Sequence, residues 1–188
     1  MAEPTRWITA PSTSITGRSD PPSAIISEKT VLIDQVADYQ PGVFYRRELP
    51  PIRAVLADVG DLDLLIIDGY VTLDPGGRPG LGAYAHEEFG VSVIGVAKTR
   101  FASAVHAIPV VRGTAKRPLY VTAAGIPPAA AAELVRTMTG GYRLPDALRR
   151  VDALARGTAL VLWHGIAVTY RPVVMLPGPG LVREQRCA

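Results

Sequence analysis

The chain has 188 residues, of which 48% are hydrophobic and 20% charged, a composition typical of a globular domain with a buried core rather than of a disordered protein. No apolar run approaches the ~20 residues of a membrane span, and no basic-then-apolar leader opens the sequence, so we expect a cytoplasmic protein without membrane association. Cys187 is the one cysteine, which excludes an internal disulfide and a cysteine-based zinc site. The net charge of +3 permits a polyanionic partner, while the excess of Arg over Lys, with abundant Ala, Gly and Pro, is typical of a GC-rich genome such as that of an actinobacterium.

The N-terminal part begins with residues 1–23, which are rich in Pro, Ser and Thr and are expected to form a flexible arm. Strand-like residues follow at 24–36, and then a turn at Tyr39–Gly42. Residues 44–57 place apolar side chains at helical spacing, with Glu48 near the helix start. Pro50 and Pro51 are compatible with this helix only in its first turn.

The middle of the chain alternates strand and helix signals. Leu64–Ile67 is a short continuous apolar run, typical of a central strand covered on both faces. A Gly/Pro-rich loop at residues 69–80 follows it, then a helix at Leu81–Phe89 and a strand at Val91–Val96. Sites in open α/β sheets gather at the loops that follow such strands.

The C-terminal part is predicted to contain a strand at Leu119–Thr122, an amphipathic helix at Pro127–Met138 and a shorter helix at Leu148–Leu154. Residues 158–176 form strand-like material, and 177–188 a tail. The whole pattern predicts an α/β fold, with one domain at residues 24–176 that contains a mixed sheet flanked by helices.

Two carboxylates lie at the edges of this expected core. Asp68 ends the buried strand, and Glu48 lies at a helix start. Carboxylate oxygens are ligands that hard divalent cations prefer, so the pair is a candidate metal site. Each residue also has a plainer interpretation, because the helix dipole favours Glu48 and a turn before Gly69 favours Asp68.

Several motifs, taken in order from about Val36 to Asp152, resemble the endonuclease V family, whose metal-dependent nucleases recognise deoxyinosine. The two longest match unchanged, and the others are similar to the family's motifs. They are Tyr39-Gln40-Pro41-Gly42, Arg46-Arg47-Glu48, Asp68-Gly69, Ile94-Gly95-Val96-Ala97-Lys98, Pro118-Leu119-Tyr120-Val121 and Gly141-Tyr142-Arg143-Leu144-Pro145. The resemblance implies a ribonuclease H-like α/β domain.

The same resemblance assigns roles to individual residues. Glu48 and Asp68 would bind Mg²⁺, and Lys98 would stabilise charge near the scissile phosphate. Tyr39, with Pro41 and Gly42, would form a wedge that enters the duplex beside the extruded base. Gly69 and Tyr70 would belong to the loop beside the site.

The chain departs from the family pattern at catalytic positions. No segment of residues 1–30 resembles the family strand that carries a further catalytic Asp, and the loop after Asp68 lacks the family's two His and two Arg residues. Asp74 is a candidate substitute ligand, although Asp74-Pro75-Gly76-Gly77 is also ordinary turn chemistry. Tyr39 could likewise simply pack on Pro41.

Three functions follow from this pattern. The first is a protein repurposed away from DNA repair, acting in a protein complex as an accessory subunit or as an enzyme on a small molecule, for instance in actinobacterial specialised metabolism. The second is an active Mg²⁺-dependent endonuclease that cuts DNA 3′ to deoxyinosine. The third is a nucleic-acid-binding module that does not cut.

The apolar segment Leu160–Met175 contains no Asp or Glu. It could fill the sheet position that the missing N-terminal strand leaves vacant, or close the core of its own domain. Alternatively, its exposed strand edge would pair with a protein partner or with a second copy of the chain.

Overall fold

The computed structural model describes residues 42–57 and 62–157, together with residues 8–9, 27–28, 31, 38, 40, 59 and 174–176. A five-stranded sheet forms its centre, in the order β5-β6-β4-β3-β7. Its strands are β3 (Leu64–Ile67), β4 (Ser92–Ala97), β5 (Ile108–Val110), β6 (Leu119–Ala124) and β7 (Val174–Leu176). Two further short strands, β1 (Ile8–Thr9) and β2 (Ser27–Glu28), pair antiparallel in a sheet of their own.

The central sheet is mixed. β3 and β4 are parallel neighbours, and the intervening helix α2 (Leu81–Phe89) provides the crossover that parallel strands need. β6 pairs antiparallel with both β4 and β5, and β7 pairs antiparallel with the free side of β3. The predicted α/β class with a mixed sheet is therefore confirmed.

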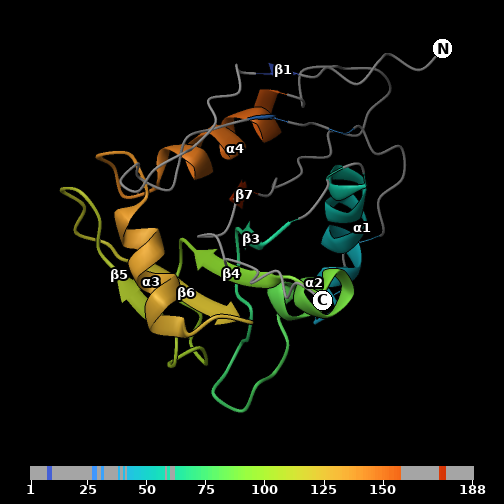
Figure 1. The fold of residues 1–188 in the computed structure, drawn as a ribbon. Coiled ribbons are helices and arrows are strands. Elements are labelled where there is room, and N and C mark those ends of the chain that lie inside the picture. The colour runs from blue at the N-terminus through green and yellow to red at the C-terminus, as the bar shows by residue number, and fades with distance from the viewer. Residues whose placement is uncertain are drawn as a thin grey trace, which may run out of the picture.

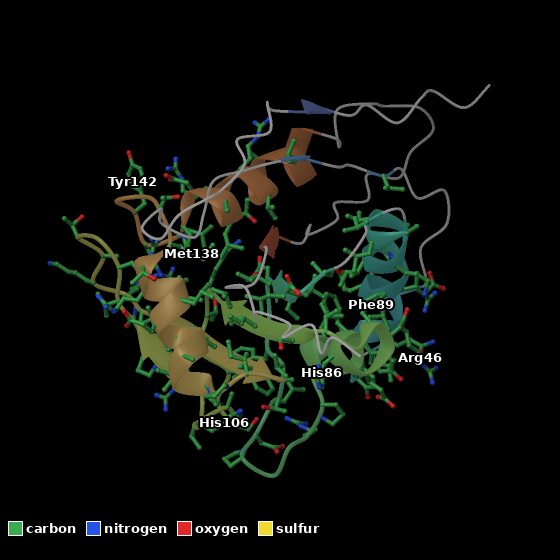
Figure 2. The ribbon with its side chains drawn as sticks, viewed as in Figure 1. Arg46, His86, Phe89, His106, Met138 and Tyr142 are labelled. Carbon is green, nitrogen blue, oxygen red and sulfur yellow. The ribbon has the colours of Figure 1, made fainter. Side chains whose placement is uncertain are left out.

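Helices cover both faces of the sheet (Figure 1). α3 (Pro128–Thr137) and α4 (Asp146–Gly157) contribute to one core cluster with the sheet, whereas α1 (Tyr45–Leu56) and α2 contribute to the other. The labelled residues of Figure 2 mark this division, with Met138 beside the end of α3 and Phe89 at the end of α2. None of the described helices is long and apolar enough to cross a bilayer.

β3 explains how one short strand serves both cores. Leu64 and Ile66 belong to the cluster with α3 and α4, while Leu65 and Ile67 belong to the cluster with α1 and α2. All four side chains are buried. Successive strand side chains point to opposite faces, so a continuous apolar run is what a strand covered on both faces requires.

The two prolines of α1 lie later than the sequence pattern predicted. The helix begins at Tyr45, so Pro50 and Pro51 fall after the first turn, where each removes a backbone N–H donor. Burial offsets this loss, because Pro51 and Ile52 are buried and Ile52 packs with β3. The helix thus depends on its tertiary contacts more than on its backbone ladder.

The structure describes only part of the C-terminal segment that was predicted to form strands. Val174–Leu176 pairs with Leu64–Ile66, so this piece of the segment completes the sheet of its own chain. The remainder of the predicted strand material, 158–173, lies outside the described residues.

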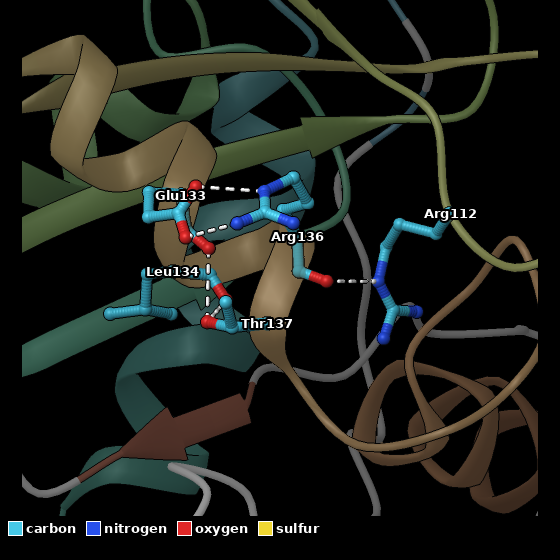
Figure 3. Close-up of polar contacts among 5 residues, drawn as sticks. All are labelled: Arg112, Glu133, Leu134, Arg136 and Thr137. Atoms are coloured by element: carbon cyan, nitrogen blue, oxygen red, sulfur yellow. Dashed lines mark hydrogen bonds and ion pairs between the residues drawn. The ribbon is translucent and has the colours of Figure 1, made fainter.

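The end of α3 is held by the buried side chain of Arg112 (Figure 3). Its guanidinium donates hydrogen bonds to the carbonyls of Arg136 at 3.3 Å and Tyr142 at 3.0 Å, and also to that of Met138. The last carbonyls of a helix have no partner within it, so Arg112 supplies one from outside. Figure 3 also shows the neighbouring ion pair between Arg136 and Glu133.

Candidate functional site

The parallel strands β3 and β4 end side by side, and each is followed by a charged residue. Asp68 comes directly after β3 and Lys98 directly after β4. The Nζ atom of Lys98 lies 2.9 Å from Oδ2 of Asp68, whose side chain is only 8% exposed. The structure therefore brings together two of the three predicted catalytic residues, at the edge of the sheet where sites are expected.

A third charge, on Asp152 of α4, joins them. Nζ of Lys98 donates to both carboxylate oxygens of Asp152, at 2.9 Å and 2.8 Å. The ammonium of Lys98 thus bridges two carboxylates that are distant in sequence, one directly after β3 and the other in α4. We call Asp68, Lys98 and Asp152 the ion-paired cluster.

Sequence reasoning did not assign Asp152 a role. A signal was present, because Asp152 follows the buried Leu148 by one helical turn and so lies on the core-facing side of α4. A carboxylate on such a face needs a partner. The partner itself, 54 residues away, was not visible in the sequence.

Glu48 lies in the first turn of α1, as predicted, and is 8% exposed. Its helix is fixed to α2 by the stacked rings of Tyr45 and Tyr84, 3.6 Å between centroids, and by an ion pair of 2.6 Å between Arg53 and Glu88. Within the described part of the chain, no three His, Cys, Asp or Glu side chains gather where they could hold a metal ion. The metal-binding role of Glu48 and Asp68 therefore stays a prediction.

Asp74 lies in the loop after β3 and is engaged with Arg78. Its Oδ1 accepts the backbone N–H of Arg78 at 3.1 Å, and its Oδ2 lies 3.2 Å from Nε of the same residue. The N–H of Gly77 also bonds the carbonyl of Asp74 at 3.1 Å. These contacts are those of a turn residue, the plainer of the two interpretations that the sequence offered.

Tyr70 joins the loop after β3 to the loop after β4. Its hydroxyl donates to the carbonyl of Thr99 at 2.8 Å and accepts the N–H of Phe101 at 3.0 Å. Burial raises the pKa of Tyr70 above its ordinary value of 10.0, although the N–H of Phe101 opposes the shift. The phenol is therefore protonated, and able to donate, across the neutral range.

Further side-chain contacts hold the same two loops together. The hydroxyl of Thr72 lies 2.8 Å from Nε2 of His106, and the hydroxyl of Ser103 donates to the carbonyl of Leu73 at 2.7 Å. The guanidinium of Arg78 lies 5.8 Å from the ring centroid of Phe101. The label of His106 in Figure 2 marks this end of the molecule.

Gly95 allows the chain after Asp68 to cross close over the sheet. A Cβ atom at this position would lie 2.6 Å from the carbonyl oxygen of Gly69 and 2.8 Å from the backbone nitrogen of Val71. That nitrogen donates to the buried hydroxyl of Thr122 at 2.8 Å. Glycine is therefore required at position 95 of the Ile94–Lys98 motif because any side chain there would collide with the backbone of the loop after Asp68.

Arg143 reaches the end of β4 from the connection between α3 and α4. Its Nη2 donates to the carbonyl of Lys98 and, at 2.8 Å, to that of Pro118. Its Nε is buried without a hydrogen-bond partner among the described residues. Sequence reasoning matched the motif around Arg143 but gave the residue no role.

The predicted wedge is described only in part. Tyr39 and Pro41 lie outside the described residues. Gly42 has φ of 82°, and the N–H of Val43 bonds the carbonyl of Gln40 at 3.3 Å. This bond closes a turn from Gln40 to Val43, one residue later than the turn predicted at Tyr39–Gly42, and Gly42 supplies its positive φ.

Comparisons with known proteins agree with this fold. The family model described as Endonuclease V matches residues 13–120, more than half of the chain. The chain is similar to the crystal structure of endonuclease V from Streptomyces avermitilis, with 27% identity and a TM-score of 0.53 over 64% of this chain and 62% of that one. It also shares its fold with endonuclease V from Bacillus subtilis, with 17% identity and a TM-score of 0.54 over 70% of this chain and 64% of that one.

The match to each of these two structures spans less than two thirds of that structure's length. No curated protein matches the chain.

Proposed function

Because the chain belongs to the endonuclease V family, we propose that it has kept the family fold while its site serves a task other than cutting DNA 3′ to deoxyinosine. It acts within a protein complex, as an accessory subunit or as an enzyme on a small molecule. The observation that supports this proposal is the ion-paired cluster, in which Lys98 lies within 2.9 Å of both site carboxylates.

An ammonium in this position competes with a metal ion. A divalent cation bound to Asp68 and Asp152 would lie close to Nζ of Lys98, and two like unit charges 4 Å apart repel by roughly 4 kcal/mol near a protein surface. A doubly charged ion doubles this figure. Metal binding would therefore require Lys98 to leave both carboxylates.

The described residues do not fit a resident Mg²⁺ while Lys98 holds this position. Asp68 and Asp152 offer suitable oxygen donors, but no third ligand joins them among the described residues, and Asp74 is engaged with Arg78. A Mg²⁺ ion is therefore not part of this proposed function.

The proposed complex rests on the C-terminal segment. β7, at the end of the described sheet, pairs with β3 through one of its two sides. A strand at the end of a sheet presents unpaired backbone groups, which a partner strand can satisfy. The outer side of β7 is the proposed place for that strand.

The test is cleavage of a labelled deoxyinosine duplex by the purified protein with Mg²⁺ or Mn²⁺, with the Asp68→Ala variant as the matched control. We expect no cleavage above that of the variant, even at high protein concentration. Robust inosine-specific cleavage that disappears in Asp68→Ala would overturn the proposal.

One observation favours a second candidate, an active nuclease. Asp152 gives Asp68 a neighbouring carboxylate that the sequence analysis had not assigned, and two carboxylates can hold Mg²⁺ partly through water. Cleavage abolished equally by Asp68→Ala and Asp152→Ala would support this candidate.

A further inference from the structure

We infer that Tyr70 and Arg143 are positioning residues, which hold the main chain around Lys98 so that its ammonium stays between Asp68 and Asp152. This inference rests on the proposal that the ion-paired cluster is the working site of the protein. Neither residue is placed in contact with Nζ of Lys98, and each acts on the backbone that carries it.

Lys98 needs such support for two reasons. Its side chain is long, and holding it in one geometry costs rotamer entropy. Lys98 also follows the last residue of β4, where the hydrogen-bond ladder of the sheet no longer fixes the backbone. Its position therefore depends on contacts made by the loops.

Tyr70 fixes the chain just after Lys98. Its hydroxyl is hydrogen-bonded to the carbonyl of Thr99 and to the N–H of Phe101, and its ring lies beside that of Phe101, with 6.1 Å between the ring centroids. Tyr70 itself is two residues beyond Asp68. The loop that carries the first carboxylate is thus bonded to the loop that carries the lysine.

Arg143 fixes Lys98 itself through its carbonyl. Arg143 lies three residues before α4, the helix that carries Asp152. One nitrogen of its guanidinium serves two carbonyls, on β4's end and just before β6, while Nε is buried without a hydrogen-bond partner among the described residues. A buried donor without a hydrogen-bond partner lowers stability, and the two carbonyl bonds must offset that cost.

The two contacts therefore form a matched pair. Each carboxylate of the cluster comes from a segment that has a second bond to the Lys98 region, through Tyr70 for Asp68 and through Arg143 for Asp152. A merely structural role for these side chains would lower stability when they are replaced, but it would leave the environment of the Lys98 ammonium unchanged.

Lysine NMR distinguishes these two roles because the chain has only three lysines, Lys29, Lys98 and Lys116. Protein labelled with ¹³C at lysine Cε gives three signals, and the Lys98→Arg variant identifies the one from Lys98. We expect Tyr70→Phe and Arg143→Gln, neither of which adds a lysine, each to move the Lys98 signal, with the signals of Lys29 and Lys116 unmoved. Acetylation of Lys98, followed by mass spectrometry, should also become severalfold faster.

Matched controls are Tyr84→Phe and Arg117→Gln, which make the same changes elsewhere. An unmoved Lys98 signal in a folded Arg143→Gln protein, with an unchanged acetylation rate, would overturn the inference even if Tyr70→Phe fails to fold. This result is independent of the cleavage assay. Cleavage by the wild type would end the proposed function, whereas the NMR result decides the positioning roles.

Discussion

At the scale of single residues, Lys98 makes the charges of Asp68 and Asp152 interdependent. Its ammonium bonds both, and its side chain is 33% exposed against 8% for Asp68 and 24% for Asp152. Exposed ion pairs contribute little to stability, whereas removing one partner of a buried pair leaves an uncompensated charge. The ion-paired cluster is half-buried, so we expect its contribution to stability to lie between that of an exposed ion pair and that of a buried one.

This arrangement predicts strong coupling between Lys98 and Asp152. Lys98→Met should destabilise the fold by about 1–3 kcal/mol, because it removes the ammonium that contacts both carboxylates. The double variant Lys98→Met/Asp152→Asn should lose less than the sum of the single variants, with a coupling of about 1 kcal/mol or more in urea unfolding. The exposed pair Arg149 and Asp146 is the control. Coupling no larger than in that control would contradict the predicted dependence.

Only some residues of the ion-paired cluster and its surroundings could be predicted from the sequence. Asp68 and Lys98 were recognisable because each follows an apolar strand inside a motif that resembles a known family. Asp152 and Arg143 act on Lys98 across 54 and 45 residues of sequence. Such pairings depend on where α4 and its preceding loop dock, which local patterns do not specify.

At the scale of elements, the helices followed from apolar spacing, but the short strand β5 did not. β5 has only three residues, with Pro109 in the middle, and proline is confined to edge strands because it cannot donate to the ladder. β5 is indeed at one edge of the sheet. Its pairing with β6, rather than any property of its own sequence, makes it a strand.

Arg112 gives a prediction at this scale, because it satisfies carbonyls at the end of α3 and in the following turn. Arg112→Met keeps the buried stem but removes every donor, so several carbonyls lose their partner. We expect a loss of about 2–4 kcal/mol, with faster amide hydrogen exchange concentrated at the C-terminal turn of α3. Arg117→Met, on an exposed position, is the control. Exchange that rises uniformly through the protein would show that Arg112 does not act as a helix cap.

At the scale of the whole molecule, the arrangement of layers was predictable and the last strand was not. A continuous apolar run at Leu64–Ile67 indicates a strand with helices on both sides, and the structure has that arrangement. The sequence left open whether the C-terminal segment pairs with its own sheet or with another chain. That choice depends on which edge lies free, and β3 offers one opposite β4.

The pairing of β7 with β3 predicts that two adjacent prolines near the C-terminus loosen the centre of the sheet. Val174 and Met175 lie opposite Ile66 and Leu65, and successive N–H groups of a strand point to opposite sides, so one of the two prolines removes an amide hydrogen that faces β3. In Val174→Pro/Met175→Pro, the amides of β3 that face β7 should exchange severalfold faster, while those of β5, at the far edge, keep their wild-type rates. Loss of β7 would also leave β3 as an open edge, so size-exclusion chromatography should show concentration-dependent self-association. Unchanged exchange throughout β3 would mean that β7 does not pair with it in solution, and the segment would then be free to join a partner's sheet.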